Sequence, residues 1–124
     1  MKLIMAGKCD ELDEFDIEKL PHDIEWFLYS YANGGYDGRG IGLAKMDDGT
    51  FKHWDLGHCS CYGPCENGAD GDLADDAAVM NWLDNEAIAA PGKTRVRNIH
   101  DYDYCHYVDM KAAYLALKAE EQGN

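Results

Sequence analysis

Four residues with metal-binding side chains lie within an eight-residue stretch of this chain: His58, Cys59, Cys61 and Cys65. Thiolate sulfur and imidazole nitrogen are the usual ligands of tetrahedral zinc. One residue separates Cys59 from Cys61, so in an extended chain both side chains lie on one face, where a single ion reaches them. Cys65 follows a Gly-Pro pair and can curl back as a third ligand. The stretch therefore predicts a structural zinc site.

The sequence leaves alternatives open at this site. The fourth ligand is either His58 or one of four other residues: His53, His100, Cys105 or His106. If no metal binds, Cys59 and Cys61 are small hydrophobic residues in a tight turn. Catalysis by cysteine needs a thiolate beside a base, but His58 and Cys59 are adjacent, and adjacent side chains on a strand point apart. We therefore assign no catalytic residue.

A second chemical possibility comes from three clustered basic residues, Lys93, Arg95 and Arg97. Their alternation over residues 93–99 places them on one face of an expected strand, where they can grip phosphates. The alternative function is therefore a small-ligand or nucleotide-binding sponge, or a metal-dependent module with the Cys/His site. The glycines at 38, 40 and 42 lack the Lys-Ser/Thr ending of a phosphate loop. They instead leave one strand face bare for a helix or an aromatic ring such as Trp26 or Tyr36.

Acidic residues dominate the charge of the chain. It has 24 Asp and Glu against 11 Lys and Arg, a formal net charge of −13. Residues 10–25 contain eight acids and one base, and residues 66–86 contain seven acids and no base, so each block carries −7. This charge disfavours direct binding to nucleic acid or to an anionic membrane. It favours a partner with a basic surface.

Two kinds of residue are expected to contact such a partner. Carboxylates pair with Arg and Lys, and tyrosines supply contact area at low entropic cost. The candidates in the acidic blocks are Asp13, Glu14, Asp70, Asp72, Asp75 and Asp76. Tyrosines alternate with acids in a third segment, which adds Asp101, Tyr102, Asp103 and Tyr104. In the simpler alternative, these acids are ordinary solvated and helix-capping residues.

The elements that position these residues follow from the apolar pattern. Strands are expected over residues 3–6, 24–31, 43–46, 51–56 and 93–99, with an Asp-Gly hairpin turn at residues 47–49. Helices are expected to begin after Asp10 and after Asp72 and to include Tyr107, and the first ends at Pro21. The order predicts one α+β domain of 124 residues, an antiparallel sheet with flanking helices.

The N-terminal residues bear on the compartment. They carry one base and an apolar stretch shorter than a signal-peptide core, and no later stretch is long enough to span a membrane. We therefore expect a cytoplasmic protein. Thiols stay reduced there, which favours metal binding by the cysteine cluster over disulfides.

The stretch from Tyr36 to Pro64 resembles a group of small, functionally uncharacterised bacteriophage proteins. The similarity is concentrated in the string Asp-Leu-Gly-His-Cys-Ser-Cys-Tyr-Gly-Pro at residues 55–64. The resemblance implies a phage origin and a small accessory role. Together with the acidity, it leads us to expect an inhibitor of a nucleic-acid-handling host or defence protein, for example an anti-CRISPR or other counter-defence protein that mimics nucleic-acid charge.

Overall fold

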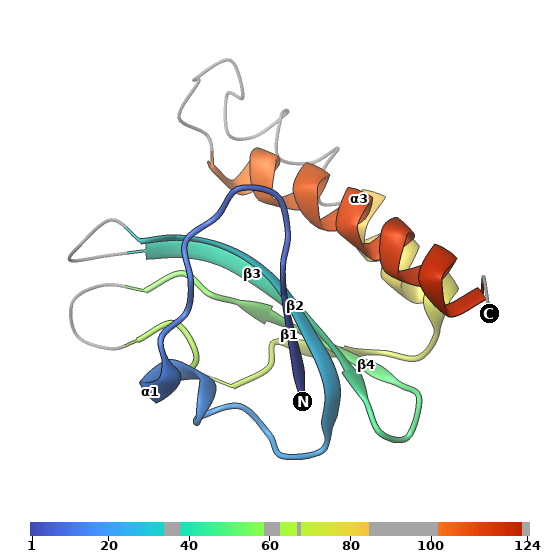
Figure 1. Cartoon of the computed structure of the whole chain (residues 1–124), viewed down its shortest axis with the longest axis horizontal. Coiled ribbons are helices and arrows are strands. Elements are labelled where there is room, and N and C mark those ends of the chain that lie inside the picture. The colour runs from blue at the N-terminus through green and yellow to red at the C-terminus, as the bar shows by residue number, and fades with distance from the viewer. Residues whose placement is uncertain (34–37, 59–62, 67, 85–101, 123–124) are drawn as a thin grey trace.

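A computed structural model describes residues 1–33, 38–58, 63–66, 68–84 and 102–122, and the side chains of α3 from Tyr107 onward. Five strands form one sheet in the order β1-β2-β3-β4-β5. Their bounds are Lys2–Met5 (β1), Ile24–Asn33 (β2), Gly38–Met46 (β3), Phe51–Asp55 (β4) and Gly71–Leu73 (β5). The helices are α1 (Glu14–Ile17), a helix that includes residues 76–84, and α3 (Tyr102–Gln122). The expected α+β class is confirmed (Figure 1).

The sheet is mixed, which differs in one pair from the antiparallel sheet we expected. β1 pairs with β2 in parallel, and the other neighbours are antiparallel. A parallel pair needs a crossover connection. Residues 6–23, including α1, make that connection across one face of the sheet (Figure 1).

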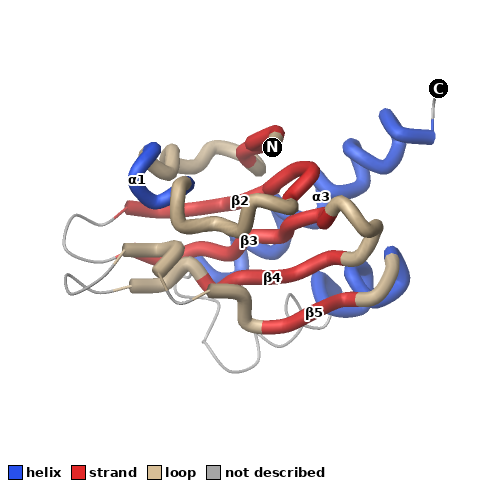
Figure 2. The backbone as a smooth tube through the Cα atoms, turned by 90° about the horizontal axis from the view of Figure 1, so that it is seen from below, coloured by secondary structure: helices blue, strands red, loops and turns tan. Residues whose placement is uncertain are grey.

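Helices cover the other face. The helix at residues 76–84 and α3 pack on it, and Val79, Leu83, Met110, Tyr114 and Leu117 join Trp26, Leu28 and Leu43 of the sheet in one core cluster. Figure 2 shows the strands side by side in sequence order, with α3 and the helix at residues 76–84 behind them. Burying this apolar face is the main favourable contribution to folding. Among the described helices, none has the length and apolar character needed to span a membrane.

A second core cluster lies under the crossover segment. It joins Leu12 and Leu20 of that segment with Phe27, Tyr29 and Trp54 of the sheet, and it also contains Cys65. The sheet therefore has a hydrophobic layer on each face, one under helices and one under irregular chain. This second layer holds the residues of the candidate site.

The expected helix over residues 10–20 is wrong in its extent, because only Glu14–Ile17 is helical and its N-cap is Asp13. Asp10 instead serves β2: its backbone N–H donates to the carbonyl of Tyr31 at 2.8 Å, and its side chain accepts the Asn33 N–H at 2.7 Å. Phe15, an apolar residue within that expected helix, is 65% exposed. Tertiary hydrogen bonds to β2 therefore outweigh local helix propensity.

The start of the second helix also differs from the expectation. Asp72 lies in β5, which pairs with β4, so it is not the N-cap. Asp75 has that role, since its side chain accepts the Ala78 N–H at 2.9 Å and its carbonyl accepts the Val79 N–H at 3.1 Å. The other expectations for strands 3–6, 24–31, 43–46 and 51–56, the turn at 47–49 and the C-terminal helix are confirmed. The expected strand at 93–99 lies outside the described residues.

Candidate functional site

The candidate metal stretch begins at a tightly held histidine. His58 forms an isolated antiparallel bridge with Gly38, with backbone hydrogen bonds of 3.1 and 3.0 Å. Its Nε2 makes a short hydrogen bond with the hydroxyl of Tyr31 at the end of β2. The two rings also stack, with centroids 5.8 Å apart and planes inclined by 21°. The backbone of His58 is therefore held by Gly38, and Tyr31 orients its imidazole through both a hydrogen bond and ring stacking.

Gly38 is required by this arrangement. A Cβ atom at this position would lie 2.5 Å from the Tyr31 hydroxyl and 2.6 Å from His58 Nε2, closer than side-chain atoms approach one another. The same holds at Gly42, where a Cβ would lie 2.5 Å from Cζ of Phe27. The expectation that these glycines admit aromatic rings is confirmed at Gly38 and Gly42, where the rings are those of Tyr31 and Phe27. Trp26 belongs to the other core cluster, and Tyr36 lies outside the described residues.

Cys65 and Asp16 lie beside this pair. Burial raises the pKa of the Cys65 thiol to about 12, and the negative charge of Asp16 adds to the shift. Burial likewise raises the pKa of Tyr31 to about 12, again with a contribution from Asp16. The pKa of Asp16 is itself raised, first by burial and then by Asp13. At neutral pH the thiol and the phenol are uncharged, as the low polarity around them requires.

The expected metal ligands are only partly described. Cys59 and Cys61 lie outside the described residues, as do His100 and the side chains of Cys105 and His106. His53 stacks on Trp82 at 4.8 Å between ring centroids, on the helix-covered face and away from Cys65. Within the described ranges, no three His, Cys, Asp or Glu residues gather in a way that could hold a metal ion.

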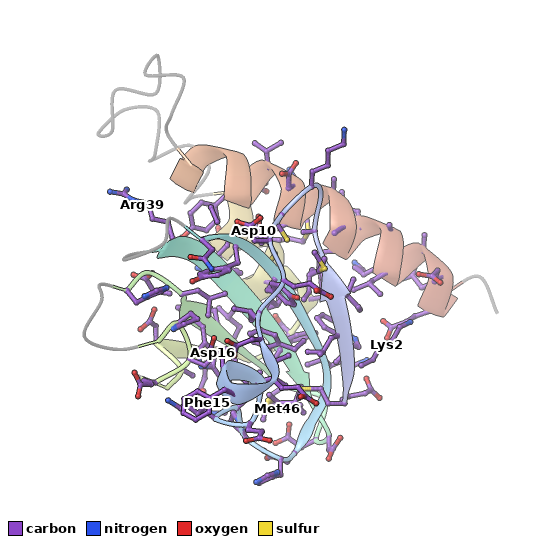
Figure 3. The ribbon with its side chains drawn as sticks, turned by 60° about the vertical axis from the view of Figure 1, so that its left-hand side comes forward. Lys2, Asp10, Phe15, Asp16, Arg39 and Met46 are labelled. Carbon is purple, nitrogen blue, oxygen red and sulfur yellow. The ribbon has the colours of Figure 1, made fainter. Side chains whose placement is uncertain are left out.

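The first acidic block forms an outward-facing surface. Six acids of the crossover segment are exposed. One of them, Asp23, lies at its end, and the other five lie within residues 10–18: Asp10, Glu11, Asp13, Glu14 and Glu18. We call these five residues the acidic ridge. The one base of the block, Lys19, pairs with Glu66 at 2.8 Å, outside the ridge. Figure 3 shows Asp10, Phe15 and Asp16 on this segment as it crosses the sheet.

The second acidic block is more closely tied to the fold. Asp70, Asp72 and Asp75 are exposed, but Asp72 pairs with Lys52 at 2.6 Å and Asp75 caps a helix. Asp76 accepts hydrogen bonds from the Tyr114 hydroxyl at 2.5 Å and from Lys118 at 2.6 Å. These bonds lower the pKa of Asp76, the bond from Lys118 most of all. Of the four residues in this block that we expected to contact a partner, Asp72, Asp75 and Asp76 therefore have partners within the chain.

The remaining expected residues are Lys93, Arg95, Arg97 and Asp101, with the side chains of Tyr102, Asp103 and Tyr104, and they lie outside the described part of the chain. The sequence analysis missed Tyr31 and Asp16. Tyr31 is part of an apolar strand in the sequence, and no local pattern reveals that it meets a residue 27 positions later.

No family model matches this chain, and no curated protein or solved structure is significantly similar to it.

Proposed function

We propose that this protein is an acidic inhibitor that binds a nucleic-acid-handling host or defence protein through the acidic ridge. The observation that carries the proposal is the exposure of five carboxylates within residues 10–18, a stretch that contains no Lys or Arg. Clustering charges of one sign raises the free energy of the folded chain through repulsion. A basic partner surface removes that repulsion and gains charge-assisted hydrogen bonds.

The physical role of the ridge is mainly to speed and orient association. Complementary charge raises the association rate and selects partners, while each exposed ion pair adds little affinity. A protein that normally binds nucleic acid presents the Lys and Arg surface that the ridge fits. The resemblance to phage proteins agrees with a counter-defence role in the host cytoplasm, and Tyr102 and Tyr104 are retained as proposed anchors.

Reversing one ridge charge should weaken this interaction specifically. We expect Glu14→Lys to raise the dissociation constant of the partner about tenfold, because it removes an attractive charge and adds a repulsive one. The matched control is Asp47→Lys, in the β3–β4 turn, which changes the net charge equally at an exposed position outside both blocks. We expect it to change the constant less than about twofold.

The partner is first captured from bacterial lysate on the immobilised protein, eluted in salt steps and identified by mass spectrometry. Biolayer interferometry then measures binding of both variants to the purified partner, with thermal unfolding to verify the fold. Equal affinities for the two variants would refute a role for the ridge. Failure of nucleic acid to compete for the partner would refute the proposed mimicry.

A second candidate is the metal-dependent module, and the fixed imidazole of His58 favours it. Residues that hold one ring nitrogen of a histidine commonly orient the other toward a metal, and Tyr31 holds Nε2. On this proposal Cys59, Cys61 and Cys65 complete a structural zinc site.

Elemental analysis tests the zinc site directly. We expect one zinc per chain in the purified protein, and loss of both the metal and thermal stability in Cys59→Ser and Cys61→Ser, since a structural site contributes folding energy. Cys9→Ser is the control, because Cys9 lies at the crossover segment and donates to the Tyr29 carbonyl at 3.8 Å. A protein without stoichiometric zinc, whose two variants unfold like the wild type, would exclude the site.

A further inference from the structure

β1 lies at one edge of the sheet and, within the described part of the chain, pairs only with β2. Figure 2 shows the N-terminal strand at this edge, with β5 at the opposite edge. The outer backbone groups of an edge strand are a template for pairing with another chain. β5 contains three residues and carries Asp72, and a short, charged strand discourages such pairing. β1 is longer and has apolar side chains at three of its four positions, so it is the edge more open to a partner.

The hydrogen bonds at the end of β1 show which backbone groups face this edge. The N–H of Ala6 donates to the Tyr29 carbonyl of β2 at 2.8 Å, so it points into the sheet. Successive residues of a strand direct their N–H and C=O groups to opposite sides. Those of Ile4 therefore point toward β2, and those of Leu3 and Met5 point away from it. The edge offers two donors and two acceptors.

The same two residues expose apolar side chains. Leu3 is 42% exposed and Met5 is 40% exposed. They pair with Phe27 and Tyr29 of the second core cluster, so they lie on the face of the crossover segment, but neither belongs to that cluster. Ile4 points to the other face, where it packs against the helix-covered core. The crossover segment thus leaves the side chains of β1 accessible, and their burial would favour association.

We propose that β1 pairs in antiparallel orientation with β1 of a second copy of this chain, which joins two five-stranded sheets into one. A twofold axis at Ile4 places Leu3 of each copy opposite Met5 of the other. Because both residues direct their backbone groups to the edge, each such pair exchanges two hydrogen bonds, as an antiparallel ladder requires. Their exposed side chains cover one another on the crossover face. The contact uses the same surface of both copies, so assembly stops at a dimer.

Charge complementarity selects a second copy as the occupant. In this register Lys2 lies opposite Ala6 of the other copy, next to Gly7. Asp109 lies against Gly7, where an added Cβ would be 2.6 Å from its Oδ2. Lys2 shares the helix-covered face with its strand partner Trp26, and Asp109 belongs to α3 on that face. Each copy therefore places its lysine beside the aspartate of the other, and neither residue forms an ion pair within the described ranges of its own chain.

The edge also limits repulsion between two chains that each carry −13. Residues 1–9 contain no Asp or Glu, whereas residues 10–25 contain eight. The contact involves few residues and is smaller than a standard interface, so we expect a weak dimer with a dissociation constant of about 50 µM. It does not use the acidic ridge, so this proposal and the proposed function can fail independently.

Sedimentation equilibrium and amide hydrogen exchange test the dimer in the full chain, with the purification tag at the C-terminus. We expect the average mass to rise from that of one chain toward that of two between about 5 µM and about 1 mM protein. Over this range the Leu3 and Met5 amides should become protected, whereas the Ile4 amide is protected throughout. A monomer at the highest concentration, or a dimer whose Leu3 and Met5 amides exchange as in the monomer, would overturn the proposal.

A charge exchange tests the contact of Lys2 with Asp109. Asp109→Lys lowers the net charge but sets two lysines against each other, so we expect a dimer about tenfold weaker. Lys2→Glu should have a similar effect, and the variant with both changes should return to within about threefold of the wild type. Asp47→Lys makes the same change in net charge away from β1 and should not weaken the dimer. A double variant as weak as the single variants contradicts the proposal.

A backbone variant tests the pairing without relying on charge. Leu3→Pro removes an N–H that the monomer does not use, so it should unfold at the wild-type temperature and form no dimer. Leu3→Ala keeps this N–H and should form a dimer about threefold weaker than the wild type. A folded Leu3→Pro protein that dimerises as tightly as Leu3→Ala would rule out pairing through β1.

Discussion

Replacing Gly40 with alanine is expected to lower the free energy of unfolding by about 3 kcal/mol, at the upper end of overpacking effects. A Cβ at Gly40 would lie 2.9 Å from the Cα of Tyr31 and closer still to the carbonyl oxygen of Ser30. Both atoms belong to the backbone of β2, which pairs with β3. The clash therefore cannot be relieved by rotation of a side chain. The two strands would have to separate at the position that aligns Tyr31 with His58. Urea unfolding monitored by circular dichroism measures the loss.

Gly49→Ala is the matched control for this substitution. Gly49 adopts a φ of +91°, and a Cβ there would meet nothing within 4 Å. The expected cost is therefore only the backbone strain, about 1 kcal/mol. If both variants lose the same stability, close approach of the strands at Gly40 does not determine the effect. A Gly40→Ala protein as stable as the wild type would contradict the packing assigned to β2 and β3.

Replacing Asp76 with alanine is expected to destabilise the protein by about 2 kcal/mol at pH 7. The substitution removes the acceptor of the Tyr114 hydroxyl, and Tyr114 is 2% exposed, so this largely buried side chain loses a hydrogen bond. It also removes the partner of Lys118. Asp75→Ala is the control: it removes the N-cap of the same helix and leaves the bonds of Asp76 to Tyr114 and Lys118 in place. We expect it to lower the free energy of unfolding by about 1 kcal/mol. Similar losses in Tyr114→Phe and Asp76→Ala, with no additivity in the double variant, would assign the effect to this bond.

Acid should abolish the difference between Asp76→Ala and the wild type. The pKa of Asp76 is lowered from 3.8 in the folded protein, so its charged form is stabilised by folding. This stabilisation is fully present above the unfolded pKa and disappears as the pH falls through the lower folded pKa. The two unfolding curves should therefore differ by a constant amount above about pH 5 and converge below about pH 3. A difference that persists unchanged at pH 2 would show that the carboxylate charge does not contribute.

The acidic ridge and the pair of Tyr31 with His58 differ in how far the sequence could predict them. The ridge lies within one segment, so its composition alone identified Asp13 and Glu14 as exposed candidates. The Tyr31–His58 pair joins the end of β2 to a residue that bridges to Gly38 of β3, and these residues meet only in the folded chain. The Cys/His stretch draws attention to His58, whereas nothing in the sequence distinguishes Tyr31 from the other aromatic residues of its strand.

The sequence by itself determined the elements whose pattern is local. Apolar runs and the Asp-Gly turn fixed β2, β3, β4 and the hairpin, because burial of a strand face and a left-handed glycine are encoded within a few residues. The tertiary structure alone decided the short α1, the parallel β1, the role of Asp72 in β5 and the contact of Tyr31 with His58. In each case a distant backbone or side-chain group offers a better hydrogen bond or packing partner than the local one. That choice depends on which segments the two hydrophobic layers bring together.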